Sequence, residues 1–287
     1  MSTSQAQIMQ ALGTGPYFTA ASAIRSRINF IKEYMIATPA ETLVLGISGG
    51  VDSSTLGRLA QLAVDELNDG LSPGDEVYHF IAVRLPYGVQ ADEDDAQAAL
   101  DFIIPSNIFT VNIKPSVDAL QHSIGAGVET GVSFGAKEDF IKGNDKARMR
   151  MMVQYNIAAR FNGLVLGTDH AAEAITGFFT KHGDGACDLV PLAGLTKGNV
   201  RAMCEELGAP ESIWGKPATA DLEELQPQLL DEDSLGVSYE NLDLFLVGET
   251  IDPQVSEKII ARYELTEHKR HGPVTPLDTW WKPNQRR

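Results

Sequence analysis

The sequence predicts an α/β fold in which helices cover both faces of a parallel β-sheet, followed by a mostly helical C-terminal part. Three observations carry this prediction. Short apolar runs alternate with amphipathic helical patterns, the runs are apolar on both faces, and the pattern after residue 190 is mostly helical. Strands that are buried on both sides need a cover on each face. In such sheets, ligands bind beyond the carboxyl ends of the strands.

The elements follow one another in a regular order. Apolar residues at helical spacing (Ile24, Ile28, Ile31 and Met35) predict a first helix that ends before Pro39. Strands are predicted at 42–47, 77–83, 108–113 and 163–167, and helices at 53–68, 92–103, 137–161, 197–207, 239–246 and 253–263. Because no linker or repeat divides the chain, residues 1–287 are expected to form one domain.

Composition limits the function classes. A net charge of −16 over 287 residues argues against sequence-independent nucleic-acid binding and against an anionic membrane as partner. No apolar run approaches the length of a membrane span, and the first residues lack the features of a secretory signal. The two cysteines, Cys187 and Cys204, form no CxxC pair, which favours a reducing cytoplasm.

The most informative motif is SGGVDS at residues 48–53, between a predicted strand and a predicted helix. This arrangement points free backbone N–H groups and the positive end of a helix dipole at an anion. Gly49 and Gly50 allow close approach of that anion, and Ser48 and Ser53 add hydroxyl donors. Asp52 would repel a phosphate unless a divalent cation lay between them, so a nucleotide loop with a built-in Mg²⁺ ligand is predicted.

Other strand ends carry further candidates. Arg84 and Gln90 follow the second strand, where they could meet a phosphate and a base, or form a solvated turn. After the fourth strand, a helix that begins near His170 would project Glu173 toward the same edge, which gives a second carboxylate for Mg²⁺. Lys197 opens another helix, where phosphate is favoured, although lysines at such places are usually only solvated.

Several alternatives fit the residues less well. The chain lacks the Walker lysine and the HExxH pair, and His170, His182 and Cys187 match no zinc spacing. The segment GAGVETG at 125–131 fails the dinucleotide pattern GxGxxG and is interpreted as a flexible loop. The acidic, proline-rich segment 215–236 has no periodicity; disorder is the favoured interpretation, with a closing lid as the alternative.

The loop SGGVDS resembles that of the PP-loop ATP pyrophosphatases, which have an adenine nucleotide alpha hydrolase-like fold. With RLPYGVQ, KGNDKARMRM, GTDHAAEAITGFFTKHGDG, PATADLE and TEHKR in that order, the chain from about residue 20 onward closely resembles bacterial ammonia-dependent NAD⁺ synthetase. The resemblance implies a ligase of NAD⁺ biosynthesis. ATP would adenylate deamido-NAD⁺ with release of pyrophosphate, and ammonia would then displace AMP. It also implies a homodimer with deamido-NAD⁺ near the subunit interface.

The resemblance assigns residues to each ligand. Those implied for ATP are Gly46, Ile47, Ser48, Gly49, Gly50, Val51, Asp52, Ser53, Arg84, Gln90, Thr168, Lys197 and Thr219. Those implied for deamido-NAD⁺ are Tyr34, Phe140, Arg148, Lys181, Asp188, His268 and Lys269. Asp52 and Glu173 would hold Mg²⁺, and with Lys197 and Asp184 they form the expected catalytic set. Asp184 is the candidate for holding ammonium or accepting its proton, or it only shapes the GDG turn.

One departure and one absence complete the sequence evidence. Cys187 stands where the family commonly has a small or hydroxyl residue, which adds a candidate oxidation site. Glutamine-dependent relatives carry an amidase domain ahead of the synthetase, whereas the first predicted strand here begins at residue 42. Free ammonia is therefore the expected nitrogen donor, unless a separate amidase subunit supplies it.

Two alternative functions remain open. The chain could be another PP-loop ligase, such as a GMP-synthetase-like or tRNA-modifying enzyme, or it could be a non-catalytic nucleotide-binding module.

Overall fold

A computed structural model describes residues 3–72, 74, 77–88, 93–127, 136–219, 224–225 and 229–282. Its centre is a sheet of four parallel strands in the order β3-β2-β1-β4, which confirms the predicted fold class. The strands are β1 Thr42–Gly46, β2 His79–Arg84, β3 Asn107–Thr110 and β4 Gly163–Val165. All four predicted strands are thus present, and β1 lies between β2 and β4, so the motifs that follow these three strands share one edge.

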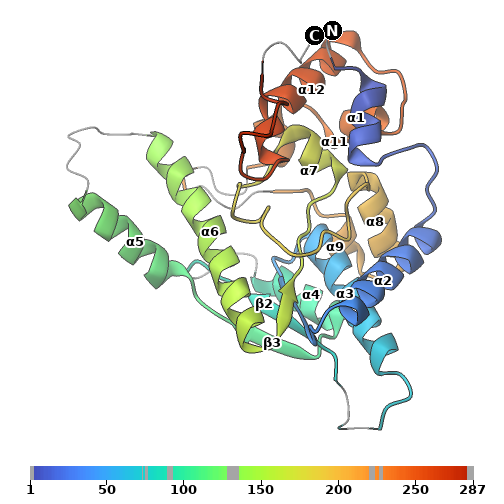
Figure 1. Ribbon diagram of the computed structural model, residues 1–287, viewed down its shortest axis with the longest axis vertical. Helices are drawn as coiled ribbons and strands as arrows, with labels where there is room; N and C mark the ends of the chain where they lie inside the picture. The colour runs from blue at the N-terminus through green and yellow to red at the C-terminus, as the bar shows by residue number, and fades with distance from the viewer. Residues whose placement is uncertain are drawn as a thin grey trace.

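Helices cover both faces of this sheet, as Figure 1 shows. Alternate β1 residues point to opposite faces: Leu43 and Leu45 belong to one buried cluster and Val44 to another. The first cluster includes apolar residues of α2, α3, α4 and α8, and the second includes residues of α5 and α6. These helices are α2 Ala20–Ala37, α3 Val51–Asn68, α4 Glu93–Ile103, α5 Lys114–Gly127, α6 Ala136–Arg160 and α8 Lys197–Glu206.

A third buried cluster joins the beginning and the end of the chain. Ile8 packs with Ile175, Leu242, Phe245 and Ile259. These residues belong to α1 Gln5–Leu12, α7 Ala171–Thr176, α11 Tyr239–Leu246 and α12 Pro253–Leu265, and Figure 1 shows the four helices grouped above the sheet. The remaining helices are α9 Glu211–Trp214, α10 Asp231–Leu235 and the 3₁₀ turn η1 Glu267–Lys269. The helical C-terminal part therefore covers the sheet edge where the motifs meet.

The structure differs from the sequence prediction in three segments. Helix α1 was not predicted. Helix α5 extends to Gly127, so the predicted flexible loop at 125–131 begins inside a helix, and residues 128–131 of that loop lie outside the described residues. In segment 215–236, the described residues include α10 and an ion pair of Glu224 with Lys142 at 2.9 Å, so these parts are folded onto the molecule rather than disordered. Within the described residues, no helix is both long and apolar enough to cross a membrane.

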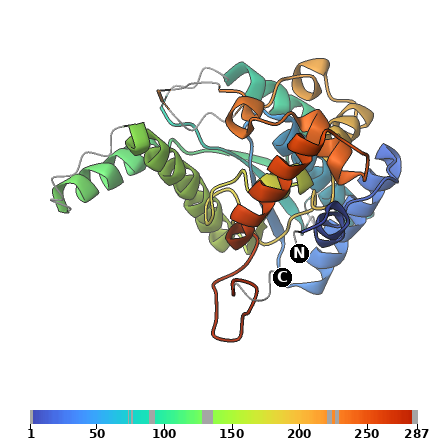
Figure 2. The ribbon, with the colours of Figure 1, turned by 90° about the horizontal axis from the view of Figure 1, so that it is seen from above.

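Figures 1 and 2 show α5 and the adjoining half of α6 extending as an arm from the body of the molecule. Apolar side chains remain exposed on this arm, including Leu120, Ile124 and Phe140. Such exposure on a long helical pair indicates a surface that a partner can cover.

Candidate active site

The phosphate loop has the backbone geometry that its glycines predict. Gly49 has a φ of +87°, and a Cβ atom there would lie 2.9 Å from the backbone nitrogen of Ala96. Gly50 caps α3, and the hydroxyl groups of Ser48 and Ser53 lie 3.1 Å apart across the loop. Only glycine fits at position 49, because a side chain would meet both an unfavourable φ and the first turn of α4.

Asp52, in the first turn of α3, pairs with a buried lysine. Nζ of Lys197 lies 2.7 Å from Oδ2 of Asp52 and 5.1 Å from the ring centre of Tyr239, and the lysine side chain is 2% exposed. Burial acts to raise the pKa of Asp52, but Lys197 and His170 bring it below its usual value. Lys197 is therefore a fixed charge of the site, and the alternative of a merely solvated lysine is wrong.

The N-terminus of α8 is not available for phosphate, although its sequence position suggested so. The backbone N–H groups of Lys197 and Gly198 donate to the two carboxylate oxygens of Asp243, at 3.1 and 2.6 Å. Asp243 belongs to α11, so a carboxylate already occupies the place where an anion would bind. Lys197 can serve an anionic ligand through its side chain alone.

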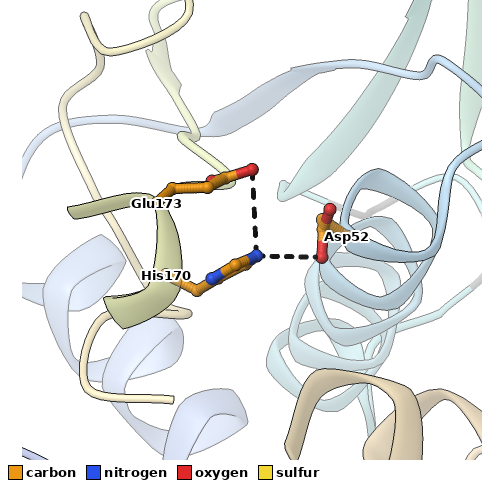
Figure 3. A group of neighbouring side chains, drawn as sticks. All are labelled: Asp52, His170 and Glu173. Atoms are coloured by element: carbon orange, nitrogen blue, oxygen red, sulfur yellow. Dashed lines mark ion pairs between the residues drawn. The ribbon is translucent and has the colours of Figure 1, made fainter. Parts of the chain in front are cut away.

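Two side chains, His170 and Glu173, face Asp52 and form a group of three with it (Figure 3). Nε2 of His170 lies 3.5 Å from Oδ1 of Asp52 and 3.8 Å from Oε1 of Glu173. Burial raises the pKa of Glu173 well above its usual value and lowers that of His170 to about 3, so the imidazole is uncharged at neutral pH. Among the described residues, Oδ1 of Asp52 and both ring nitrogens of His170 have no hydrogen-bond partner.

These donors fit a divalent cation. Two carboxylates that are buried close together disfavour each other's ionisation, and a cation between them removes that repulsion. Their oxygen atoms are the ligands that Mg²⁺ prefers, and nucleotide phosphates can complete its shell. His182 and Cys187 are not members of the group, so the structure does not assemble the alternative zinc set of His170, His182 and Cys187. Burial also raises the pKa of Cys187 to about 12, which argues against the expected oxidation site.

A cavity of about 630 Å³ opens at this edge of the sheet. Most of the residues expected to bind ATP line it: Gly46, Ile47, Ser48, Gly50, Val51, Asp52, Ser53, Thr168, Lys197 and Thr219. Gly49 lies on the side of the loop that packs against the first turn of α4. Arg84 is not among the lining residues, and its guanidinium pairs with Glu93. Gln90 lies outside the described residues.

The residues expected to bind deamido-NAD⁺ fall into two groups. Phe140 and Lys269 line the cavity, and Lys269 donates to the carbonyl groups of Gly177 and Phe179 at 2.8 and 2.6 Å. Five others lie outside the cavity that the described residues form: Tyr34, Arg148, Lys181, Asp188 and His268. The structure thus brings together most of the predicted ATP residues and only part of the predicted dinucleotide residues.

Several of the outer residues are engaged in contacts within the chain. The ammonium group of Lys181 donates to the carbonyl of His268 at 2.6 Å. Asp188 accepts hydrogen bonds from the backbone N–H of Val165 at 2.7 Å and from the hydroxyl of Tyr155 at 3.3 Å. Asp188 therefore also fixes the end of β4, a structural task that the motif did not suggest.

Asp184 lies on the wall of the same cavity as Asp52 and Glu173. Its Oδ1 accepts the backbone N–H of Thr180 at 3.0 Å, which is the turn-shaping contact expected from the GDG sequence. Burial raises the pKa of Asp184 above its usual value, and the hydrogen bond from Thr180 offsets only part of this effect. The carboxylate therefore shapes the turn, and burial makes it easier to protonate than an exposed aspartate.

One face of α6 supplies lining residues that the sequence did not identify. Asn144, Arg150 and Gln154 recur at helical spacing along the cavity. Oε1 of Gln154 accepts the N–H of Gly46 at 2.7 Å, so α6 holds the beginning of the phosphate loop in place. The spacing of the polar residues on this helix was the available signal for a ligand face.

Comparisons with known proteins agree with this geometry. Residues 23–273 match the family model described as NAD synthase. An NH(3)-dependent NAD(+) synthetase of Rhodococcus jostii is 52% identical and covers 98% of this chain and 100% of its own length, and one of Pseudoalteromonas translucida is 55% identical over 96% and 99%.

Two solved structures are also similar. The NAD⁺ synthetase of Burkholderia pseudomallei has a TM-score of 0.79 at 45% identity and covers 94% of this chain and 96% of its own. The NMN synthetase of Francisella tularensis has a TM-score of 0.76 at 31% identity, over 91% and 100%. From the family match and from relatives that share half of its residues over nearly its whole length, this chain belongs to the NAD synthase family.

Proposed function

We propose that this chain is an ammonia-dependent ligase that converts deamido-NAD⁺ to NAD⁺ with ATP, the last step of NAD⁺ biosynthesis. One observation carries the proposal: a phosphate loop, two facing carboxylates and a buried lysine meet at one cavity in a chain of the NAD synthase family. The order of the motifs along the chain supports the same conclusion.

The first step makes the carboxylate a better acyl donor. A carboxylate oxygen of deamido-NAD⁺ attacks the α-phosphorus of ATP, the bond from that phosphorus to the bridging oxygen breaks, and pyrophosphate leaves. The phosphate loop and Lys197 are placed to stabilise charge that develops on the phosphates. Asp52 and Glu173 are the residues that would hold Mg²⁺, which when bound supplies electrostatic stabilisation of phosphate charge.

The second step forms the amide. Ammonia attacks the carboxyl carbon, the bond from carbon to the phosphate oxygen breaks, and AMP leaves. Only neutral ammonia has the lone pair that this attack needs, so Asp184 is proposed to hold ammonium and accept its proton. Exclusion of water from the cavity protects the adenylate, and closure of segment 215–236 over the cavity is part of this proposal. Protease sensitivity of that segment that is unchanged by substrates would contradict the closure.

We extend the proposal to a homodimer. Tyr34 on α2 and Arg148 on α6 lie outside the cavity, and apolar side chains remain exposed on both helices, among them Phe30 and Met152. A second subunit on this surface would complete the dinucleotide site. Sedimentation of the purified chain tests this, because a monomer at all concentrations would exclude it. A reducing cytoplasm remains a prediction that rests on the two free cysteines.

The decisive assay follows pyrophosphate release from ATP, Mg²⁺ and ammonium in the presence and absence of deamido-NAD⁺. We expect release only with deamido-NAD⁺, with NAD⁺ and AMP formed in equal amounts. Nicotinate mononucleotide and xanthosine monophosphate serve as competing substrates, because an NMN synthetase is among the similar structures and a GMP-synthetase-like ligase is an alternative. Preference for either one, ADP as product, or ATP binding without turnover would overturn the proposal.

A further inference from the structure

Two cations beside the phosphate loop are held by carboxylates of a single helical turn. Arg84, the last residue of β2, makes a bidentate ion pair with Glu93, and both nitrogen–oxygen distances are 2.9 Å. Lys216, on the cavity wall, forms an ion pair with Asp95. Glu93 and Asp95 both belong to the first turn of α4.

This turn also packs against the phosphate loop. The backbone of Asp95 and Ala96 is the surface that a side chain at Gly49 would strike, at 3.0 and 2.9 Å. On the other side, the N–H of Ile47 donates to the carbonyl of Val83, the residue before Arg84, at 2.9 Å. Both cations therefore lie beside the loop where nucleotide phosphates are expected.

The burial of the first pair is unequal. The side chain of Arg84 is 5% exposed, whereas that of Glu93 is 62% exposed. A buried guanidinium needs an anion at all times, but the exposed carboxylate can move into water at little cost. Phosphate oxygens fit the guanidinium fork as well as a carboxylate does. The cation is thus a fixed part of the site, and its partner is exchangeable.

We propose that Glu93 and Asp95 are positioning residues that occupy Arg84 and Lys216 until ATP binds, and that its phosphates then displace them. The inference rests on the proposed function, because it takes ATP as the ligand. Arg84 and Lys216 thus each have an anionic partner both before and after ATP binds. The exchange lowers the affinity for ATP by the free energy needed to release the two carboxylates.

The test compares Glu93→Gln and Asp95→Asn with Asp94→Asn, a matched control in the same turn. Asp94→Asn removes the same charge, and among the described residues Asp94 makes no ion pair. Binding of Mg–ATP and of adenosine to the full chain is measured by calorimetry, and the KM for ATP is measured separately from kcat. Thermal unfolding shows that each variant is folded.

Glu93→Gln and Asp95→Asn are each expected to bind Mg–ATP about threefold to fivefold more tightly than Asp94→Asn, with KM for ATP reduced to match. Adenosine, which has no phosphate, should bind all variants equally. Affinity for Mg–ATP that is unchanged or weaker in both Glu93→Gln and Asp95→Asn would overturn the inference. Wild-type chain that binds Mg–ATP but releases no pyrophosphate would instead overturn the proposed function, and the comparison of dissociation constants would still decide this inference.

Discussion

Replacing Lys197 by methionine should expose the energetic dependence of Asp52 on its partner. The substitution keeps the length of the side chain and removes the ammonium group that lies 2.7 Å from the carboxylate. Removing one partner of a buried ion pair destabilises a protein by about 3–5 kcal/mol, because the other charge remains buried and unpaired. The side chain of Asp52 is 18% exposed, so we expect the lower end, about 3 kcal/mol in the free energy of unfolding.

Urea denaturation at neutral pH measures this loss, and Lys32→Met is the matched control. Lys32 pairs with Glu66 at 2.8 Å, but these two side chains are 25% and 32% exposed, so breaking their pair should change stability by about 0–1 kcal/mol. Arg25 also pairs with Glu66, at 2.6 Å, so the comparison sets a buried carboxylate that loses its lysine against a partly exposed one that keeps a second cation.

The pH dependence gives a second test of the same reasoning. In the wild-type protein, Lys197 helps hold the pKa of Asp52 below its unfolded value, so this stabilisation is present above that value and is lost as pH falls through the folded-state pKa. In the variant, burial without a partner raises the pKa of Asp52, so protonation relieves the unpaired charge. The deficit should shrink as pH falls from neutral toward the unfolded-state pKa of an aspartate, about 3.9. A deficit below about 1 kcal/mol at neutral pH, or one that does not change with pH, would refute the argument.

Two further substitutions test the loop and the proton acceptor. Gly49→Ala places a Cβ atom 2.9 Å from the nitrogen of Ala96 at a φ of +87°, so it should lower the free energy of unfolding by about 1–3 kcal/mol and weaken ATP binding. Gly125→Ala is the control, because a Cβ atom there meets open space. Equal melting temperatures of the two variants would contradict the prediction. Asp184→Asn keeps an acceptor for Thr180 N–H but cannot take a proton, so kcat/KM for ammonium should fall about 100-fold. Because burial raises the folded-state pKa of Asp184, its stabilising effect is lost as pH rises, and the variant should be no less stable than wild type at about pH 8. If kcat/KM for ammonium is unchanged in Asp184→Asn, the role of Asp184 is limited to shaping the turn.

The sequence predicts the sheet well because each strand is apolar on both faces and is followed by a turn motif. The segment around α1 was missed because eight residues carry too few apolar positions to show a period. A local signal was nevertheless present, since Ser4 and Gln7 form a capping box. Helix α5 was missed because its last residues, which include Gly125 and Gly127, resemble a loop.

The site was predictable where it depends on the order of parallel strands. Asp52 and Glu173 follow β1 and β4, which pair directly, so their proximity follows from topology. The position of Asp243 at the N-terminus of α8 depends on packing of α11 against α8, which no local pattern encodes. The prediction that the N-terminus of α8 binds phosphate was wrong, because Asp243 already occupies it. The role of the Lys197 side chain in ATP binding stays a prediction.

An acidic protein that binds two polyanions raises the question of where its cations lie. The net charge of −16 is spread over the whole chain, whereas charges separated by more than about 8 Å are largely screened at physiological salt. The charges that line the cavity therefore matter more for anion binding than the net charge of the chain. Five cationic residues line the cavity: Arg150, Lys197, Lys216, Arg262 and Lys269. Lys197 and Lys216 are paired with carboxylates of α3 and α4, so part of the acidic excess holds these cations in place before substrate arrives. Substrate phosphates then replace or share these partners, and specificity for anions follows from the arrangement of the wall rather than from the charge of the chain.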